Sequence, residues 1–235
     1  MEDLQQRWLF ALSAPMVAVN RHAGADYALA SLYPDNEFVD LKESWDIAER
    51  ADLLAMIQRM TDDGHARELS SAYWEHARLL PSQWQALLDS LQPAQRVAYE
   101  FVAETSMVCG AAGIRAWDLG RMSFLARIGQ LNGWLNLEEN LWLHSRFSLR
   151  ARYYYQSWHS YLAGFVIGRA YWNCLGHEEA NEQALSLSRQ GSEPAHRAMV
   201  RELALSPAAG FDELPWDMEL ELPEKPESLE AFDWS

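Results

Sequence analysis

Two oppositely charged side chains in an otherwise apolar, helix-forming segment are the residues of this chain best placed for binding chemistry. Asp118 and Arg121 are three positions apart in W-D-L-G-R, so on a helix they share a face with Leu125 and Ile128. Arg169 lies in a second apolar segment, among aromatic residues. A buried arginine needs a partner, because an unpaired charge in a protein interior costs several kcal/mol. We therefore expect Asp118 to pair with Arg121 or Arg169 between two packed helices.

Three interpretations of this cluster are compatible with the sequence. In the first, the Asp118 carboxylate and the arginines form a buried network that orients two helices and also accepts hydrogen bonds from tryptophan indoles. In the second, Arg121, Arg127 and Arg169 surround a pocket and bind an anionic ligand together with Asp118. Direct catalysis is the third. An open cleft at Asp118, Arg121 and Arg169 would favour a ligand, and a closed core would favour the network.

The chain lacks the short motifs that signal common catalytic and cofactor sites. Its histidines show no H-E-x-x-H or comparable metal-ligand spacing, and no G-x-S-x-G, glycine-rich phosphate loop or C-x-x-C occurs. Glu138 and Glu139 are adjacent, so on a helix they point in different directions and do not form an acid/base pair. We accordingly expect neither a metal site nor a cofactor.

Capping signals and apolar periodicity predict the helices that hold these side chains. Asn136 followed by Glu139 marks one helix start, and the three predicted helices span 115–132, 137–156 and 157–174. In the last of them, small residues at helical spacing would let another helix approach closely. The residues expected to form this packing motif are Trp117, Ser157, Trp158, Tyr161, Gly164, Gly168 and Trp172.

Similar signals run through the earlier part of the chain. Ser44 is placed to cap a helix that stops at Gly64, and Pro81 and Pro93 open two more. Strand signals hardly appear. The sequence therefore predicts an all-α fold, with a single multi-helix globular domain over residues 1–210 and an irregular acidic C-terminal tail over residues 211–235.

The net charge of −15 restricts the kinds of partner. An acidic chain repels a phosphate backbone, so we expect no nucleic-acid binding and favour a basic protein as partner. The tail alone contributes −8, because it carries nine acids against Lys225. It is either a solvated end or an extended segment that docks on the body or on a partner. Trp216 and Trp234 are its candidate residues for a partner contact.

Several features favour a cytoplasmic location. The only cysteines, Cys109 and Cys174, lie in apolar helical patterns that are typical of buried thiols in a reducing compartment. The N-terminus is a poor signal peptide, because two acids precede Arg7 and Pro15 interrupts the apolar residues that follow. The longest apolar stretches are too short and too polar to span a bilayer, so we expect no membrane association.

The motifs described above also resemble those of a known family. W-D-L-G-R at 117–121 with Arg127 and Gly133, followed by S-W-x-x-Y-x-x-G-x-x-x-G-R-x-x-W from Ser157, is similar to the YbeU/YbeR-like family of bacterial proteins, a domain of unknown function. The similarity extends more weakly to W-D-I-A-E-R-A-D-L at 45–53 and to Gly64-His65, so the family-like core covers 45–172. The resemblance implies a bacterial helical protein and assigns no catalytic or ligand residue.

Three classes of function remain as hypotheses. The first is a protein–protein interaction module, such as an immunity-type or regulatory partner of a basic protein, because acidic patches speed association with basic surfaces. The second is an anionic-ligand-binding protein or enzyme that uses the Arg/Asp cluster. The third, a toxin or effector domain, would need a catalytic site that the sequence does not contain.

Overall fold

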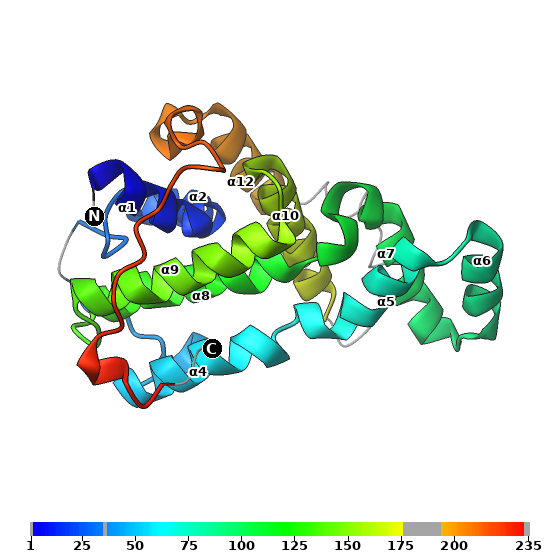
Figure 1. Ribbon diagram of the computed structural model, residues 1–235, viewed down its shortest axis with the longest axis horizontal. Helices are drawn as coiled ribbons and strands as arrows, with labels where there is room; N and C mark the ends of the chain where they lie inside the picture. Colours follow the sequence, from blue (N-terminus) through cyan, green and yellow to red (C-terminus); the bar gives the residue numbers. More distant parts are fainter. Residues whose placement is uncertain (1, 35–36, 176–193, 233–235) are drawn as a thin grey trace.

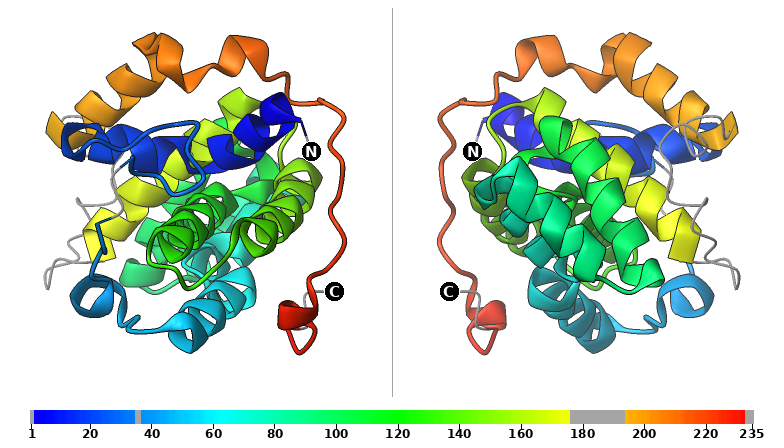
Figure 2. Two further views of the ribbon diagram at one scale, coloured as in Figure 1. Left: turned by 90° about the vertical axis from the view of Figure 1, so that its left-hand side faces the viewer. Right: turned by 90° about the vertical axis from the view of Figure 1, so that its right-hand side faces the viewer.

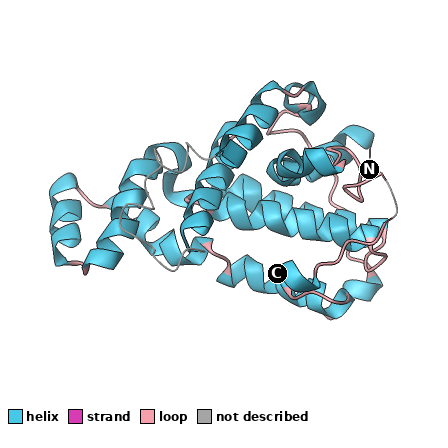
Figure 3. Cartoon of the chain, turned by 180° about the vertical axis from the view of Figure 1, so that it is seen from behind, coloured by secondary structure: helices cyan, strands magenta, loops and turns pink. Residues whose placement is uncertain are grey.

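A buried helical pair forms the centre of the molecule. The computed structural model describes residues 2–34, 37–175 and 194–232, and within these ranges it contains helices and no strand (Figure 3). α8 (Arg115–Leu131) and α9 (Leu137–Tyr154) lie side by side along the long axis (Figure 1). From Ala116 to Gly129 every residue of α8 except Arg121 is buried. The predicted all-α fold is confirmed.

Other helices cover the central pair on different sides. α1 (Asp3–Phe10) and α2 (Ala14–Asn20) lie on one side, and α4 (Arg50–Asp63) lies on the opposite side, as the end-on views show (Figure 2). α10 (Trp158–Leu175) crosses α8, and α12 (Pro194–Leu205) packs on α2. Among the described helices, none is both long and apolar enough to cross a membrane.

A second, smaller core occupies one end of the molecule. α5 (Ala66–Arg78), α6 (Pro81–Ser90) and α7 (Pro93–Cys109) pack around their own apolar cluster at the right of Figure 1. Ile167 and Tyr171 of α10 belong to this cluster, so α10 contacts both cores. The turn from α4 into α5 is consequently a junction between the two parts of the fold.

The three central helices begin and end close to their predicted bounds. α8, α9 and α10 each differ from the prediction by two residues or fewer at either end. At the start of α9, Asn136 accepts a hydrogen bond from the Glu139 backbone N–H at 2.9 Å, and Glu139 accepts one from the Asn136 backbone N–H at 2.8 Å. This reciprocal capping box is a local feature, which is why the sequence reveals it.

Glycines bring α8 and α10 together. A Cβ on Gly168 would lie 2.4 Å from the Cβ of Trp117, and a Cβ on Gly120 would lie 2.6 Å from the Phe165 ring. Tyr161 on the same stripe is fully buried and donates to the Leu12 carbonyl at 2.8 Å. The predicted small-residue contact therefore exists, with α8 as the partner helix. Trp172 at its far end is 44% exposed.

The helix predicted to follow Ser44 begins later than expected. α3 (Lys42–Trp45) is a single turn that ends at Asp46, whose φ of 55° is left-handed. The Asp46 carboxylate accepts a hydrogen bond from Lys42 Nζ at 2.5 Å, and α4 starts only at Arg50. Aspartate tolerates this conformation better than most residues, because its short side chain can bond locally. The Ser44 cap prediction is wrong for this reason.

The C-terminal segment docks on the helices. Residues 211–232 run down one side of the molecule, past α1 and α9, to the N-terminal end of α4 (Figure 2). The indole N–H groups of Trp8 and Trp158 donate to the carbonyls of Pro215 and Leu214, at 2.9 and 2.6 Å. Leu214 itself is 1% exposed. Of the two alternatives left open for the tail, the structure shows the extended, docked one.

Candidate functional site

Asp118 is the N-terminal cap of a helix that is distant in the sequence. Its carboxylate accepts hydrogen bonds from the backbone N–H groups of His65, at 3.2 Å, and Ala66, at 2.8 Å, where α5 begins. The chain passes so close that a Cβ on Gly64 would lie 2.3 Å from an Asp118 oxygen. A carboxylate at a helix N-terminus is stabilised by unpaired N–H groups and by the helix dipole. The residue that caps α5 therefore comes from α8.

Arg121 lies beside this cap, stacked between aromatic rings. Its guanidinium lies 4.6 Å from the Trp45 ring centroid and 5.0 Å from that of Trp117. Nη1 donates to Nδ1 of His65 at 2.9 Å, which requires that nitrogen to accept, and lies 3.8 Å from Asp118. Burial lowers the pKa of Arg121 to about 10, although the Asp118 charge opposes this shift. The predicted Asp118–Arg121 pair is present as a long contact.

Arg127 is not part of this cluster. Its side chain is fully buried and donates to the carbonyls of Asp26, Tyr27 and Leu29 and to the Ser13 hydroxyl. Burial lowers its pKa to about 9. The guanidinium thus fixes the loop that follows α2. The prediction that Arg127 helps to bind a ligand is wrong, because its donors point at backbone oxygens in the interior.

Arg169 does not meet Asp118 in the described contacts. It is half-buried on α10, beside the glycine that contacts Trp117. The two oxygens of Asp118 are occupied by the α5 amides, with His65 and Arg121 nearby. Of the two alternatives predicted for Asp118, the structure shows the contact with Arg121, and the hydrogen-bond donors to Asp118 are the α5 amides.

A buried Ser–His contact resembles a nucleophile with its base. Ser123 lies 2.8 Å from Nε2 of His144, whose Nδ1 lies 2.8 Å from the Asn140 carbonyl. Both side chains are fully buried, and burial lowers the His144 pKa to about 3. The imidazole is therefore neutral, with Nδ1–H donating to the Asn140 carbonyl and Nε2 accepting from the Ser123 hydroxyl. No substrate can reach this pair, so it is a satisfied part of the core.

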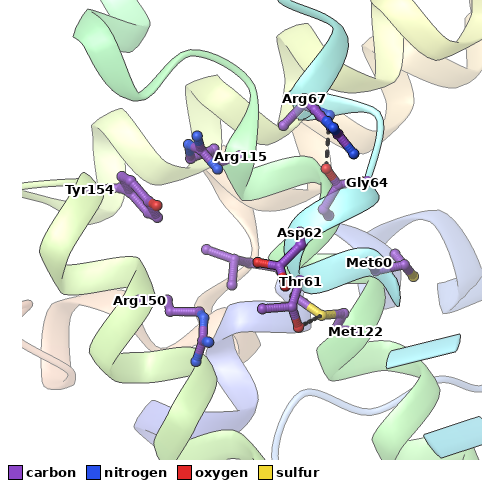
Figure 4. Close-up of a pocket in the computed structure, with 12 residues that line it drawn as sticks. Met60, Thr61, Asp62, Gly64, Arg67, Arg115, Met122, Arg150 and Tyr154 are labelled. Carbon is purple, nitrogen blue, oxygen red and sulfur yellow. Dashed lines mark hydrogen bonds between the residues drawn. The ribbon is translucent and has the colours of Figure 1, made fainter. Parts of the chain in front are cut away.

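A cavity of about 350 Å³ adjoins the Asp118 cap (Figure 4). We call it the arginine pocket. Its walls are the α4–α5 turn, the start of α8 and the second half of α9. The lining residues are Met60, Thr61, Asp62, Gly64, Ala66, Arg67, Arg115, Asp118, Leu119, Met122, Arg150 and Tyr154.

Three of the lining side chains are arginines from three different helices. Arg115 begins α8 and lies 4.5 Å from the Tyr154 ring centroid, Arg150 is half-buried on α9, and Arg67 is exposed and pairs with Asp63. Figure 4 shows Arg115, Arg150 and Tyr154 across the cavity from Thr61. None of the three arginines was singled out from the sequence. They are distant from one another along the chain, so no local motif contains them.

A second cavity, of about 440 Å³, lies between α3 and the α4–α5 turn. We call it the Trp45 pocket. Arg59 and Arg121 are its cationic side chains, and it shares Met60 and Gly64 with the arginine pocket. The lining residues are Glu43, Ser44, Trp45, Asp46, Met56, Arg59, Met60, Asp63, Gly64, His65, Glu68 and Arg121.

The Trp216 side chain packs against other parts of the same chain. Its ring packs 4.8 Å from Trp158 and 5.5 Å from Trp8, and its indole N–H donates to the Tyr155 carbonyl at 3.2 Å. This half-buried side chain anchors the tail, and its contact with a partner stays a prediction. Trp234 lies outside the described residues. Among the residues that the structure covers, no group of three or more His, Cys, Asp or Glu side chains could hold a metal ion.

The sequence has clear relatives. The family described as "Protein of unknown function (DUF1266)" matches residues 40–216. The uncharacterized proteins YbeU and YbeR of Escherichia coli (strain K12) are 39% and 38% identical to the chain over 216 residues, which is 92% of each sequence compared. No solved structure matches significantly. The resemblance predicted from the motifs is confirmed, and the matched region is wider than 45–172.

Proposed function

We propose a ligand-binding function for this chain, which belongs to the DUF1266 family: it binds a small organic anion in the arginine pocket. The observation that carries the proposal is that Arg115 and Arg150, from two helices, line one cavity, whose lining also includes the exposed, Asp63-paired Arg67, in a protein whose net charge is −15. A guanidinium matches the geometry of a carboxylate or phosphate and can bind it through two parallel hydrogen bonds.

The charges of the pocket favour an anion. Asp118 also lines it, but its oxygens already accept from two backbone N–H groups and are thereby compensated. Arg115 has no carboxylate partner among the described residues, and its guanidinium lies over the Tyr154 ring. An anion that enters the pocket would supply the missing negative charge close to Arg115.

The shape of the pocket favours an organic molecule over a bare ion. Met60, Leu119 and Met122 contribute apolar surface opposite polar groups. A volume of about 350 Å³ lies at the lower end of the range for small-molecule sites, roughly 300–1,000 Å³. A small phosphorylated or polycarboxylate metabolite fits this combination of charge and size.

Calorimetric titration of the full chain with inorganic phosphate, citrate and a sugar phosphate tests the proposal. Arg115→Gln and Arg150→Gln should each weaken binding about tenfold or more, since a hydrogen bond to a charged group contributes about 1.5–3 kcal/mol. Arg96→Gln is the matched control, because Arg96 is a surface arginine on α7 outside the pocket. Equal affinity of wild type and the Arg115→Gln/Arg150→Gln variant for all three probes would contradict the proposal.

A second candidate function is electrostatic binding of a basic protein through the tail. While the tail docks by its apolar residues, its described acids all face solvent. They are Asp212, Glu213, Asp217, Glu219, Glu221, Glu224, Glu227 and Glu230. A row of carboxylates of this kind speeds association with a basic surface and loses its effect as salt rises.

Charge-removing substitutions separate this function from the role of the tail in the fold. Glu219→Gln, Glu221→Gln and Glu224→Gln together leave the docked apolar residues in place, whereas truncation after Gly210 would expose Trp8 and Trp158. Capture of a basic partner should fall in the triple variant and at high salt. If the wild type and the triple variant capture the same partner equally, the acids of the tail do not bind it.

A further inference from the structure

We infer that the Trp45 pocket is a second binding site, separate from the arginine pocket, and that its ligand is a free α-amino acid with an apolar or aromatic side chain. The inference does not rest on the proposed function, because the cationic side chains of the two cavities differ, although both cavities include Met60 and Gly64. Three sets of groups in the pocket match the three parts of such a ligand.

Arg59 and Arg121 match the α-carboxylate. Within the described contacts, the Arg121 guanidinium makes one hydrogen bond, from Nη1 to His65, and its stacking on Trp45 supplies no acceptor for the other N–H groups. Asp118 is 3.8 Å away and already bonded to the α5 amides. The only hydrogen bond of Arg59 among these contacts is to the Met56 sulfur.

The two guanidinium groups also repel each other. The charge of Arg59 contributes, after burial, to lowering the pKa of Arg121, so the groups are close enough to interact electrostatically. A carboxylate bound to both would relieve this repulsion and provide the acceptors that Arg121 lacks. In the described contacts, none of the acids that line the Trp45 pocket forms an ion pair or a hydrogen bond with Arg59 or Arg121.

Glu43 matches the α-ammonium group. Of the acids that line the pocket, Asp46 pairs with Lys42, Asp63 pairs with Arg67, and Glu68 accepts from the Tyr171 hydroxyl. Glu43 is exposed and forms no ion pair with a described residue. A pocket lined by two arginines and by a carboxylate without an ion-pair partner suits a ligand that carries both charges, and a dianion would be repelled by the acids that line it.

Trp45, Met56 and Met60 match an apolar side chain. Trp45 is half-buried, with the Arg121 guanidinium near its ring and Phe124 at 6.0 Å between ring centroids. Thioethers adapt their shape to different apolar groups and pack well against aromatic rings. The volume of about 440 Å³ has room for an amino acid as large as phenylalanine and for some water.

Calorimetric titration with amino acids and with their blocked derivatives tests the inference. L-Phenylalanine and L-leucine are the first probes, followed by the remaining common amino acids. We expect one or more to bind. N-acetylation, which removes the ammonium charge, and conversion to the primary amide, which removes the carboxylate, should each weaken binding about tenfold or more.

Two exposed lining residues connect the result to the pocket. Arg59→Gln should weaken binding of the amino acid and of its N-acetyl form, whereas Glu43→Gln should weaken only the amino acid. Arg96→Gln and Glu104→Gln are controls of the same chemistry on α7, and Arg115→Gln should have no effect here. The inference is overturned if no common amino acid binds, if the N-acetyl form binds as tightly as the amino acid, or if Arg59→Gln changes nothing.

Discussion

At the scale of single residues, the main finding is that two buried charges, those of Asp118 and Arg127, are satisfied by backbone groups. Asp118 accepts from two N–H groups of α5, and Arg127 donates to three carbonyls. A charge compensated by backbone dipoles depends on its partners as a charge in an ion pair does, because its removal leaves buried polar groups with fewer hydrogen bonds. The charged residues therefore hold elements in place.

The first prediction concerns Asp118. Asp118→Ala removes the cap of α5, leaves two backbone N–H groups without their acceptor and removes the carboxylate 3.8 Å from Arg121, so the free energy of unfolding should fall by about 2–4 kcal/mol. Asp118→Asn should cost less, since its amide oxygen can still accept one bond. Urea denaturation measures both. Asp62→Ala, an exposed acid beside the same pocket, is the control and should change stability by less than about 0.5 kcal/mol.

The second prediction concerns His144 and pH. Burial lowers its pKa to about 3 in the folded chain, from 6.5 for an exposed imidazole. Between these values the unfolded state binds a proton that the folded state does not, so stability falls as pH falls. From pH 7 to pH 5 this group alone should cost about 2 kcal/mol.

His144→Gln removes that titration and should make the loss of stability between pH 7 and pH 5 smaller by about 2 kcal/mol than in wild type. The other titrating groups are the same in both proteins, so their contributions to the pH dependence cancel when the two are compared. His22→Gln, at an exposed position, should retain the wild-type pH dependence. Parallel pH profiles for wild type and His144→Gln would show that the imidazole is not buried in its neutral form.

At the scale of elements, the crossing of α8 and α10 depends on glycine. The backbones approach so closely at Gly168 that even a methyl group would overlap Trp117. The helices must then separate or tilt, and overpacking of this kind costs about 1–3 kcal/mol. Because α10 also contributes Tyr171 to the second core, a shift of α10 would disturb the packing of both cores.

The third prediction follows from this contact. Gly168→Ala should lower the free energy of unfolding by about 1–3 kcal/mol, although alanine is the better helix former. His159→Ala, an exposed change on the same helix, should have an effect below about 0.5 kcal/mol. Thermal and urea denaturation would measure both, and a stabilised Gly168→Ala protein would mean that the helices are not in close contact.

At the scale of the whole molecule, the docked tail connects parts of the chain that are far apart. Arg152 on α9 donates to the Met218 carbonyl at 2.6 Å, and Ser228 donates to Glu139 at 2.5 Å, next to the Arg50–Glu139 ion pair. Most hydrogen bonds between the tail and the helices join a side chain of a helix to a backbone carbonyl of the tail. The tail is thus part of the folded unit and covers an aromatic surface that would otherwise be exposed.

The fourth prediction tests this docking. Trp216→Ala removes a ring that packs on Trp8 and Trp158, so it should destabilise the protein by about 3 kcal/mol and increase proteolytic cleavage within 211–232. Leu222→Ala, at an exposed position of the same segment, is the control. Unchanged protease sensitivity in Trp216→Ala would show that the tail is held without this ring.

The sequence by itself determined the fold class and the central helices. Periodicity, proline at helix starts and the Asn136–Glu139 box are local signals, because a helix forms its hydrogen bonds within a few residues. The contact between α10 and another helix was also predictable, since Gly164 and Gly168 repeat at helical spacing. The family resemblance was visible for the same reason, as its motifs are contiguous.

Only the tertiary structure decided which groups meet. The sequence allowed Asp118 to pair with more than one arginine. In the folded chain its carboxylate instead accepts from the N–H group of Ala66, 52 residues earlier, at the start of α5. The arginines of the pocket come from three helices, and the tail reaches Trp158 from 56 positions along the chain. Side-chain partners depend on how helices pack, and packing is settled by the shape of the whole core. No local pattern encodes those distances.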